Sequence, residues 1–288
     1  MHSLANTSRR VAATPCRWLR RLTASCLTLL AVTQAHADLL ARIRADGKVR
    51  VAMSAATPPF NYLDANNNLV GSEIDTARLL ARGLGVKLEI VRIPASERVT
   101  VLLERRADLV LSTLSITPER ERQIAFSVPY SQIPVVIAAP QAHQYNSMLD
   151  LDGKTVGILA NSSNLTSLIH DAPGAMPLEY PENTKMLAGY AAGEFDILSA
   201  PQSLVDRYNR DKPKRPMVIQ FMQSVFNIAV GMPNGEKPLR DWINDWVVAN
   251  LRNDNLGAIY RKHHGGSLPT TIAPADSGKD ARKDAVRK

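Results

Sequence analysis

The chain has 288 residues, 45% of them apolar, and its 35 Lys and Arg against 27 Asp and Glu give a formal charge of +8. This length is enough for one large domain or two medium ones with hydrophobic cores. The average apolar content and the mixed signs of charge exclude a chain that is disordered throughout. A basic excess is typical of proteins that bind nucleic acids or membrane surfaces, so its position along the chain decides what it means.

Residues 1–37 have the pattern of an export signal. They contain five arginines and no acid, followed by the apolar run Leu22–Val32 and the sequence A-H-A at 35–37. This order predicts a secretory signal peptide that is cleaved between Ala37 and Asp38, and a mature protein in the periplasm. The apolar run and its flank are too short and too polar to span a bilayer.

Both cysteines, Cys16 and Cys26, lie in the predicted signal peptide. The mature chain is therefore expected to have no thiol nucleophile, no disulfide and no cysteinate metal site. A lipid anchor on Cys26 is a weaker alternative, because Thr23 stands where such an anchor site has Leu. Export by a twin-arginine route from Arg9 and Arg10 is also open, although this pair lies far from the apolar run.

The basic excess belongs mainly to the two ends of the chain. Residues 269–288 are rich in Ala, Asp and Lys without apolar periodicity, and we predict a disordered tail there. Five of the 35 basic residues lie in the signal, and five of them with three of the 27 acids lie in the tail. Residues 38–269 keep 25 basic and 24 acidic side chains, a charge of +1, so no nucleic-acid partner is expected.

Along 38–269, short apolar strands alternate with helical stretches, which predicts an α/β fold with largely parallel sheets. Strands are predicted at 48–53, 86–93, 107–111, 135–139, 154–159, 196–199 and 226–231. Helices are predicted at 73–84, 99–105, 165–169, 185–192 and 239–251, with a further helix starting at Thr117-Pro118-Glu119. In the helix at 239–251, Trp242 and Trp246 follow the apolar spacing and are expected in the core.

The usual catalytic and metal-binding motifs are missing from the sequence. No two of the six histidines have the spacing of a metal pair, and no G-x-S-x-G, H-E-x-x-H or phosphate-binding loop occurs. We therefore predict no catalytic residue, no metal and no cofactor. His263 and His264 are interpreted as cationic or solvated side chains at the end of the last helix, and Glu73 and Asp75 as structural carboxylates.

The stretch Ala107–Tyr130 carries the strongest chemical signal. A buried strand is followed by the hydroxyls of Ser112, Thr113 and Ser115, at the end of a strand where open α/β sheets bind ligands. Arg120 follows in the first turn of the next helix. Hydroxyls, free N–H groups and a guanidinium that converge form a carboxylate site. The alternative is that the hydroxyls cap helices and Arg120 is solvated.

Several motifs together resemble the extracellular solute-binding proteins, family 3, which belong to polar amino-acid ABC transporters. They are P-P-F-N-Y at 58–62, V-G-S-E-I-D at 70–75, S-E-R-V at 96–99, A-D-L-V-L-S-T-L-S-I-T-P-E-R at 107–120, I-A-F-S-V-P-Y at 124–130, L-D-G-K-T-V-G-I-L at 151–159, A-G-E-F-D-I-L at 192–198 and A-I-Y-R-K at 258–262. The resemblance covers about 48–265, and the block at 107–120 is its most specific part.

The resemblance implies a two-lobed type II periplasmic binding protein of the Venus-flytrap kind, in which the lobes close over a ligand. Two crossover hinge strands connect the lobes in this family. Lobe 1 is expected to be discontinuous and lobe 2 to be an insertion within it. The expected ranges are 38–134 plus 234–268 for lobe 1, 141–225 for lobe 2, and 135–140 and 226–233 for the hinge crossovers.

The resemblance also implies roles for individual residues in binding a small-molecule carboxylate ligand. Arg120 is expected to hold the carboxylate, with N–H and hydroxyl bonds from Ser115 and Thr113. Ser112 is expected to accept a hydrogen bond from a ligand amino group. Ser163 and Asn164 are expected to reach the same carboxylate from lobe 2 across the cleft.

Three positions in this chain depart from the usual family pattern. Pro201 stands where the family usually has an Asp for the ligand ammonium, and Gln202 beside it offers a neutral contact. Ser54 and Thr57 stand where a charged and an aromatic residue often contact the ligand. Arg98 matches an arginine that some members use for a second ligand carboxylate; the alternative is an exposed side chain on a helix. A buried ammonium without a carboxylate is costly, which argues against a basic amino acid.

The expected function is therefore that of a periplasmic substrate-binding component of an ABC importer. The ligand would be an amino acid or a related acid, and the partner a membrane permease with its cytoplasmic ATPase. The binding protein itself is expected to be a monomer. One alternative is an enzyme of the cyclohexadienyl-dehydratase type on the same fold, which needs an acid in the cleft. Another is a ligand-sensing module whose partner is a membrane receptor.

Overall fold

The computed structural model describes residues 38–269 and Ile272. The predicted signal peptide with both cysteines, its cleavage site on the Ala37 side and most of the predicted tail lie outside the described residues. None of the helices within the described part is both long and apolar enough to cross a membrane.

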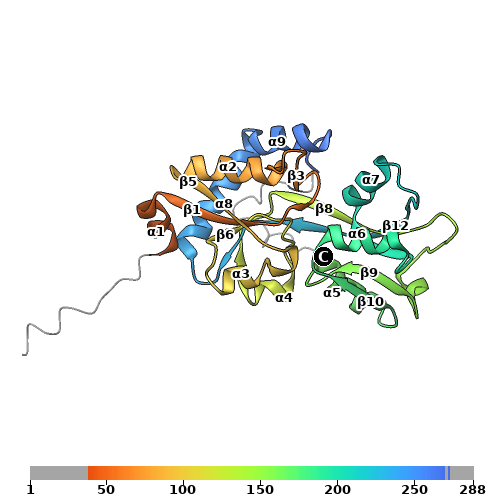
Figure 1. Ribbon diagram of the computed structural model, residues 1–288. Coiled ribbons are helices and arrows are strands. Elements are labelled where there is room, and N and C mark those ends of the chain that lie inside the picture. Colours follow the sequence, from red (N-terminus) through yellow and green to blue (C-terminus); the bar gives the residue numbers. More distant parts are fainter. Residues whose placement is uncertain (1–37, 270–271, 273–288) are drawn as a thin grey trace, which may run out of the picture. The chain divides into compact units, whose positions relative to one another are not determined.

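Two five-stranded sheets and the helices packed on them form two lobes (Figure 1). We call the part built on the first sheet the first lobe and the part built on the second sheet the second lobe. In chain order the elements are α1 (Leu39–Asp46), β1 (Lys48–Met53), β2 (Ala56–Thr57), β3 (Asn61–Leu63), β4 (Leu69–Val70), α2 (Ser72–Leu84), β5 (Lys87–Arg92), the 3-10 turn Ala95–Glu97, α3 (Thr100–Leu103), β6 (Leu109–Val110), α4 (Pro118–Glu121), β7 (Ile124–Phe126), β8 (Ser131–Ala139), the 3-10 turn Met148–Leu151, β9 (Thr155–Leu159), α5 (Ser163–Asp171), β10 (Met176–Tyr180), α6 (Asn183–Ala192), β11 (Ile197–Pro201), α7 (Gln202–Arg210), β12 (Val218–Ile228), β13 (Gly231–Pro233), α8 (Lys237–Arg252) and α9 (Asn255–His264).

The first sheet has the strand order β5-β1-β6-β13-β7. β1 pairs in parallel with β5 and β6, whereas β13 pairs antiparallel with β6 and β7. Helix α2 covers this sheet with the fully buried Ile74, Ala77 and Leu80. The helix starts after Gly71, whose φ of 128° and close approach to the Phe60 carbonyl leave no room for a Cβ atom.

The second sheet has the strand order β10-β9-β11-β8-β12. β9 pairs in parallel with β10 and β11, and β8 runs antiparallel to β11 and β12. Helices α6 and α7 contribute Met186, Tyr190, Leu204 and Val205 to the core on one side. The predicted α/β architecture is therefore confirmed. The prediction of largely parallel sheets is wrong, because two of the four strand pairings in each of these sheets are antiparallel, and all of these involve β8 or β13.

The two connecting strands lie side by side. β8 and β12 are paired from Ser131 opposite Ile228 to Ala139 opposite Val218. At the first-lobe end, Tyr130 N–H donates to the Ile228 carbonyl oxygen, and Ser127 N–H to that of Val230. β8 starts before the strand predicted at 135–139, whereas the strand predicted at 226–231 covers only the end of β12 and the start of β13. The lobe limits and hinge segments predicted from the sequence stay predictions.

The C-terminal helices return to the first lobe, where α9 packs on α2 and α8 packs on α1 and α9 (Figure 1). Trp246 is 8% exposed in the first-lobe core, as its spacing predicts. The interpretation of His264 as cationic or solvated is wrong: its ring stacks on Tyr260, meets Phe60 edge-on and hydrogen-bonds Ser72. Burial, followed by the charge of His263, lowers the pKa of His264 to about 4.

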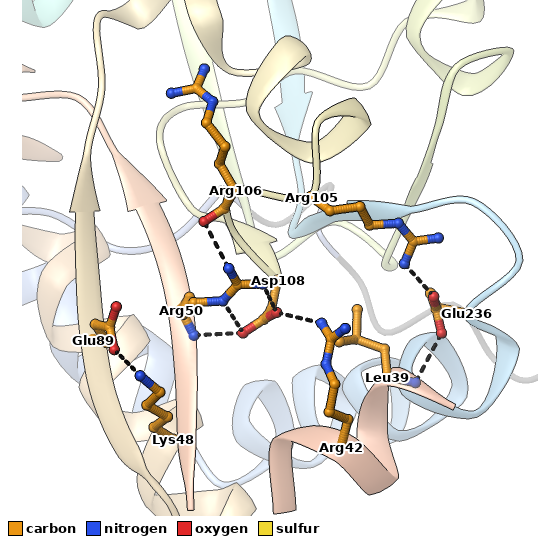
Figure 2. Close-up of polar contacts among 9 residues, drawn as sticks. All are labelled: Leu39, Arg42, Lys48, Arg50, Glu89, Arg105, Arg106, Asp108 and Glu236. Atoms are coloured by element: carbon orange, nitrogen blue, oxygen red, sulfur yellow. Dashed lines mark hydrogen bonds and ion pairs between the residues drawn. The ribbon is translucent and has the colours of Figure 1, made fainter. Parts of the chain in front are cut away.

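A buried carboxylate holds the N-terminal helix to the first sheet. Figure 2 shows Asp108, 3% exposed, between Arg42 of α1 and Arg50 of β1. Its Oδ2 accepts from Arg50 N–H at 2.8 Å, and its Oδ1 accepts from the guanidinium of each arginine. Nearby, Glu236 accepts from Leu39 N–H and from Arg105, which ties the start of α1 to the segment before α8.

Candidate functional site

A small cavity lies between the lobes, where residues from both sheets meet. Its volume is about 30 Å³. Residues of the first lobe, the connecting strand β8 and the second lobe line it: Thr57, Arg98, Thr113, Ser115, Ile133, Val135, Leu159, Ser162, Ser163, Asn164, Asn183 and Pro201. Six of the predicted binding residues are in this group, namely Thr57, Arg98, Thr113, Ser115, Ser163 and Asn164.

The turn after β6 carries the hydroxyls of the first lobe and has an unusual backbone. Thr113 has φ of 47°, in the left-handed region that non-glycine residues seldom adopt. Its N–H donates to Oε1 of Glu73 at 2.7 Å, and its hydroxyl to the Ser112 carbonyl oxygen. Tyr130 donates to the same carboxylate oxygen at 2.7 Å, and Asn61 donates to Oε2.

Glu73 thus links the turn at Thr113 to the start of the lobe connection at Tyr130. The side chain is 1% exposed. Burial raises the pKa of Glu73, although hydrogen bonds from Tyr130, Thr113 and Asn61 favour the ionised form. The prediction of a structural carboxylate agrees with this position. The sequence did not indicate that it supports the cavity wall, because no local pattern connects residue 73 with residue 113.

Arg98 is buried behind the same turn. The exposed alternative considered from the sequence is wrong, because the residue is 5% exposed. Its Nε donates to the Ala95 carbonyl oxygen at 2.6 Å, and its Nη1 to the carbonyl oxygens of Ser112 and Thr113 at 3.0 and 2.9 Å. Burial lowers its pKa to about 10, against the opposing effect of Glu73, so the guanidinium stays charged at neutral pH.

Arg120 joins the two lobes. It is 6% exposed and lies in α4, which starts with a Thr117 cap and Pro118 as the sequence predicts. Nη1 donates to the Ser115 carbonyl oxygen at 2.9 Å, and Nη2 to that of Asn161 in the second lobe at 2.8 Å. Asn161 has φ of 53°. Burial and then the charge of Arg98 lower the pKa of Arg120 to about 9, with Glu119 opposing.

Arg120 faces a neighbouring pocket of about 250 Å³ rather than the small cavity itself. This pocket also contains Asn161, Thr117 and Ser162, and Ser162 lines both spaces. The structure therefore places Arg120, which is predicted to bind the ligand carboxylate, beside the cavity that the predicted hydroxyls line. Arg120 hydrogen-bonds the Ser115 carbonyl oxygen, and Ser162 lines both spaces.

The second lobe presents the start of α5 to the cavity. Ser162 caps this helix, and Ser163 donates to the hydroxyl of Ser115 across the lobes at 3.1 Å. The amide nitrogen of Asn164 donates to Ser199. Ser163 and Asn164 are 7% and 6% exposed. Ser163 thus lies against Ser115, whereas the Asn164 amide nitrogen points to its own lobe. The expected contacts of both residues with a ligand carboxylate stay predictions.

A further contact between the lobes involves a residue that the sequence did not single out. Asn183, the first residue of α6, is 1% exposed and lies on the cavity wall. Its Nδ2 donates to the Ala56 carbonyl oxygen at 3.2 Å and to the Thr57 hydroxyl at 3.1 Å. An Asn at a helix start is ordinary in sequence, so only the packing of the lobes reveals this contact.

The remaining predicted binding residues lie outside the small cavity. Ser54 and Ser112 hydrogen-bond each other at 2.8 Å, and Ser54 lines a separate pocket of about 330 Å³ that Glu182 also lines. Gln202 is half-buried at the start of α7 and is not among the residues that line the cavity. Pro201, the residue at the usual Asp position, does line it.

This arrangement suits an anion with further polar groups. Two buried arginines and several hydroxyls lie within one region, and none of the described residues that line the cavity is acidic. A volume of about 30 Å³ holds a water molecule but not an amino acid, so a larger ligand requires the lobes to separate. No group of three or more His, Cys, Asp or Glu side chains among the described residues is placed to hold a metal ion.

Two α/β lobes joined by paired strands, with buried arginines and hydroxyls between them, define a type II periplasmic binding protein. Residues 49–266 match the family of bacterial extracellular solute-binding proteins, family 3. The chain belongs to this family, which confirms the resemblance found in its motifs.

Similar proteins include binding proteins and one enzyme. The chain is 27% identical over 218 residues to the putative ABC transporter arginine-binding protein 2 of Escherichia coli, covering 74% of this chain and 89% of the relative. It is 29% identical over 180 residues to cyclohexadienyl dehydratase of Pseudomonas aeruginosa, covering 60% and 67%. The crystal structure of the cysteine-binding protein from Campylobacter jejuni has a TM-score of 0.74 at 25% identity and covers 83% of this chain and 98% of that one.

Proposed function

We propose that this protein is the periplasmic substrate-binding component of an ABC importer, and that it binds a small polar carboxylate between its lobes. The ligand class is an amino acid or a related acid. The closed form would be presented to a membrane permease that works with a cytoplasmic ATPase. Family membership and the binding proteins among the relatives support this proposal.

The observation that carries the proposal is the environment of Arg120. This guanidinium is buried between two lobes, near a second buried arginine, and its hydrogen-bond acceptors are main-chain oxygens rather than a carboxylate. A buried charge without a counter-ion is costly, and a ligand carboxylate would supply one. For this to happen the lobes part, and Nη2 exchanges the Asn161 oxygen for a ligand oxygen.

The test is a calorimetric comparison of Arg120→Ala with the wild type, after a thermal-shift screen of amino acids, 2-hydroxy acids and dicarboxylates has identified a ligand. Loss of a buried, bidentate charge pair costs about 3–5 kcal/mol, so the affinity should fall by at least about a hundredfold. Arg122→Ala is the matched control, because Arg122 is exposed at the end of the same helix. Equal binding by wild type and Arg120→Ala, or no carboxylate that binds, would contradict the proposal.

The dehydratase relative favours an enzyme as the second candidate. An enzyme of that kind needs an acid at the substrate. None of the described residues that line the cavity is acidic, and Glu73 lies one hydrogen bond behind Thr113. Incubation with a cyclohexadienyl acid distinguishes the two functions. Release of carbon dioxide and water by the wild type, but not by Arg120→Ala, would support the enzyme. A role as a sensor instead requires capture by a membrane receptor.

A further inference from the structure

Asn183 carries a buried hydrogen-bond acceptor that is not used. Its Oδ1 has no hydrogen-bond partner among the described residues, and the side chain is 1% exposed. The other unpartnered buried side-chain atoms of the described chain, on Ser131, Ser203 and Tyr208, do not line the cavity, whereas Asn183 does. Buried polar atoms are nearly always paired, so this one points to a ligand group.

The hydrogen bonds of Asn183 fix which end of the amide is free. The amide has two terminal atoms, and the one that is hydrogen-bonded contacts the carbonyl oxygen of Ala56, which only accepts hydrogen bonds. That atom must therefore be the Nδ2 donor, and the free atom must be the oxygen. A flipped amide would place Oδ1 against the Ala56 carbonyl oxygen, which cannot donate, and is disfavoured. The cavity thus presents an acceptor, which requires a donor on the ligand.

The charges around the cavity limit what this donor can be. Arg98 lines the same space, Arg120 lies next to it, and no acidic side chain is among the described lining residues. Pro201 and Val135 add apolar surface to the wall. An ammonium placed here would be buried near positive charge without an acidic side chain on the cavity wall to pair with, whereas an uncharged hydroxyl can donate to the Asn183 oxygen.

We propose that Asn183 Oδ1 accepts a hydrogen bond from an uncharged donor of the ligand, and that the preferred ligand is a 2-hydroxy carboxylate rather than the corresponding 2-amino acid. This inference rests on the proposed carboxylate-binding function and specifies its substrate class. Arg120 provides the contact for the carboxylate, and Asn183 distinguishes the group on the neighbouring carbon. The site is then electrically matched to a ligand of net negative charge.

The test uses ligand sets that share one carbon skeleton: leucine, glutamate and arginine, each with its 2-hydroxy and its deaminated analogue. Calorimetry with wild-type protein should show the 2-hydroxy member of one set binding at least about tenfold more tightly than the other two members. In Asn183→Ala the advantage of the hydroxy member over the deaminated one should disappear, while the deaminated member keeps its affinity. Lys185→Ala is the control, because Lys185 is exposed on the same helix.

A second variant tests the charge argument without disturbing the Asn183 amide. Pro201→Asp restores an acid at the cavity wall and should shift the preference toward the 2-amino member by about tenfold or more. Stronger binding of an amino acid by the wild type, or an unchanged hydroxy preference in Asn183→Ala, overturns this inference while leaving the proposed function intact. Failure of every member of all three sets to bind, together with no binding by any carboxylate in the thermal-shift screen, overturns the proposed function itself.

Discussion

The network around Asp108 gives a prediction of stability that the structure allows us to quantify. Asp108→Asn removes the charge and replaces one carboxylate oxygen by an NH2 group. In the native protein each oxygen accepts two hydrogen bonds, from Arg42 and Arg50 for Oδ1 and from the main chain and Nε of Arg50 for Oδ2. The asparagine amide keeps one of these oxygens. Its NH2 group faces N–H donors on the other side, so the hydrogen bonds on that side are lost.

The magnitude follows from the exposure of the partners. Removing one member of a buried charge pair costs about 3–5 kcal/mol. The Asp108 side chain is 4% exposed, but those of Arg42 and Arg50 are 45% and 28% exposed and regain water in the variant. We therefore expect a loss near the lower limit, about 3 kcal/mol. For a protein of this size that corresponds to a melting temperature lower by about 6–12 °C.

Thermal unfolding followed by circular dichroism at neutral pH measures the effect. The matched control is Glu89→Gln, which removes the ion pair with Lys48 on the neighbouring strands β5 and β1 (Figure 2). Both partners of that pair are about half exposed, so its loss should leave the melting temperature nearly unchanged. A shift of under about 2 °C in Asp108→Asn, or equal shifts in both variants, would refute the argument from burial.

Two further predictions concern pH and the cavity wall. The pKa of His264, lowered to about 4 by burial and His263, lies below the usual value near 6.5, so its contribution to stability is complete above pH 6.5 and is lost as the pH falls toward 4. His264→Phe, which keeps the stacking, should reduce the loss of stability between pH 7 and pH 4 by about 2–3 kcal/mol in denaturant titrations, and an unchanged loss would contradict this. Glu73→Ala leaves the Thr113 N–H and the Tyr130 hydroxyl without their acceptor, and should weaken ligand binding by about tenfold or more while the protein stays folded. Calorimetry on a variant with native circular dichroism measures the effect, and wild-type affinity would refute the supporting role.

Much of the fold follows from local pattern, because buried strands and one-sided helices repeat their apolar residues at fixed spacing. The helix start at Thr117 is confirmed by its cap, in which the hydroxyl accepts from Arg120 N–H. β10 was not predicted, since it lies at a sheet edge with four of five residues exposed and shows no apolar alternation. α7 was also missed, because only Leu204 and Val205 of its residues are buried.

The site was predictable where its residues are close in sequence. Ser115 and Arg120 share one turn and helix, so their proximity follows from the strand that precedes them. Asn183 and Glu73 meet the same region from elements that are distant in sequence, and their roles depend on which lobe surfaces touch. The buried position of Arg98 also depends on tertiary structure, since its hydrogen-bond acceptors are main-chain oxygens whose positions are set by the turn at Thr113.

In the proposed binding mode, the bond between Arg120 and the Asn161 carbonyl oxygen would make the protein's own backbone a competitor of the ligand. A carboxylate that engages Nη2 replaces an acceptor that is already there, so binding gains only the difference between the two hydrogen bonds and the added charge. Asn161 holds its carbonyl there from a left-handed conformation that few residue types tolerate. The affinity of the site would thus be adjustable through residue 161, whose side chain need not contact the ligand, by changing the strength of the hydrogen bond between its carbonyl oxygen and Arg120.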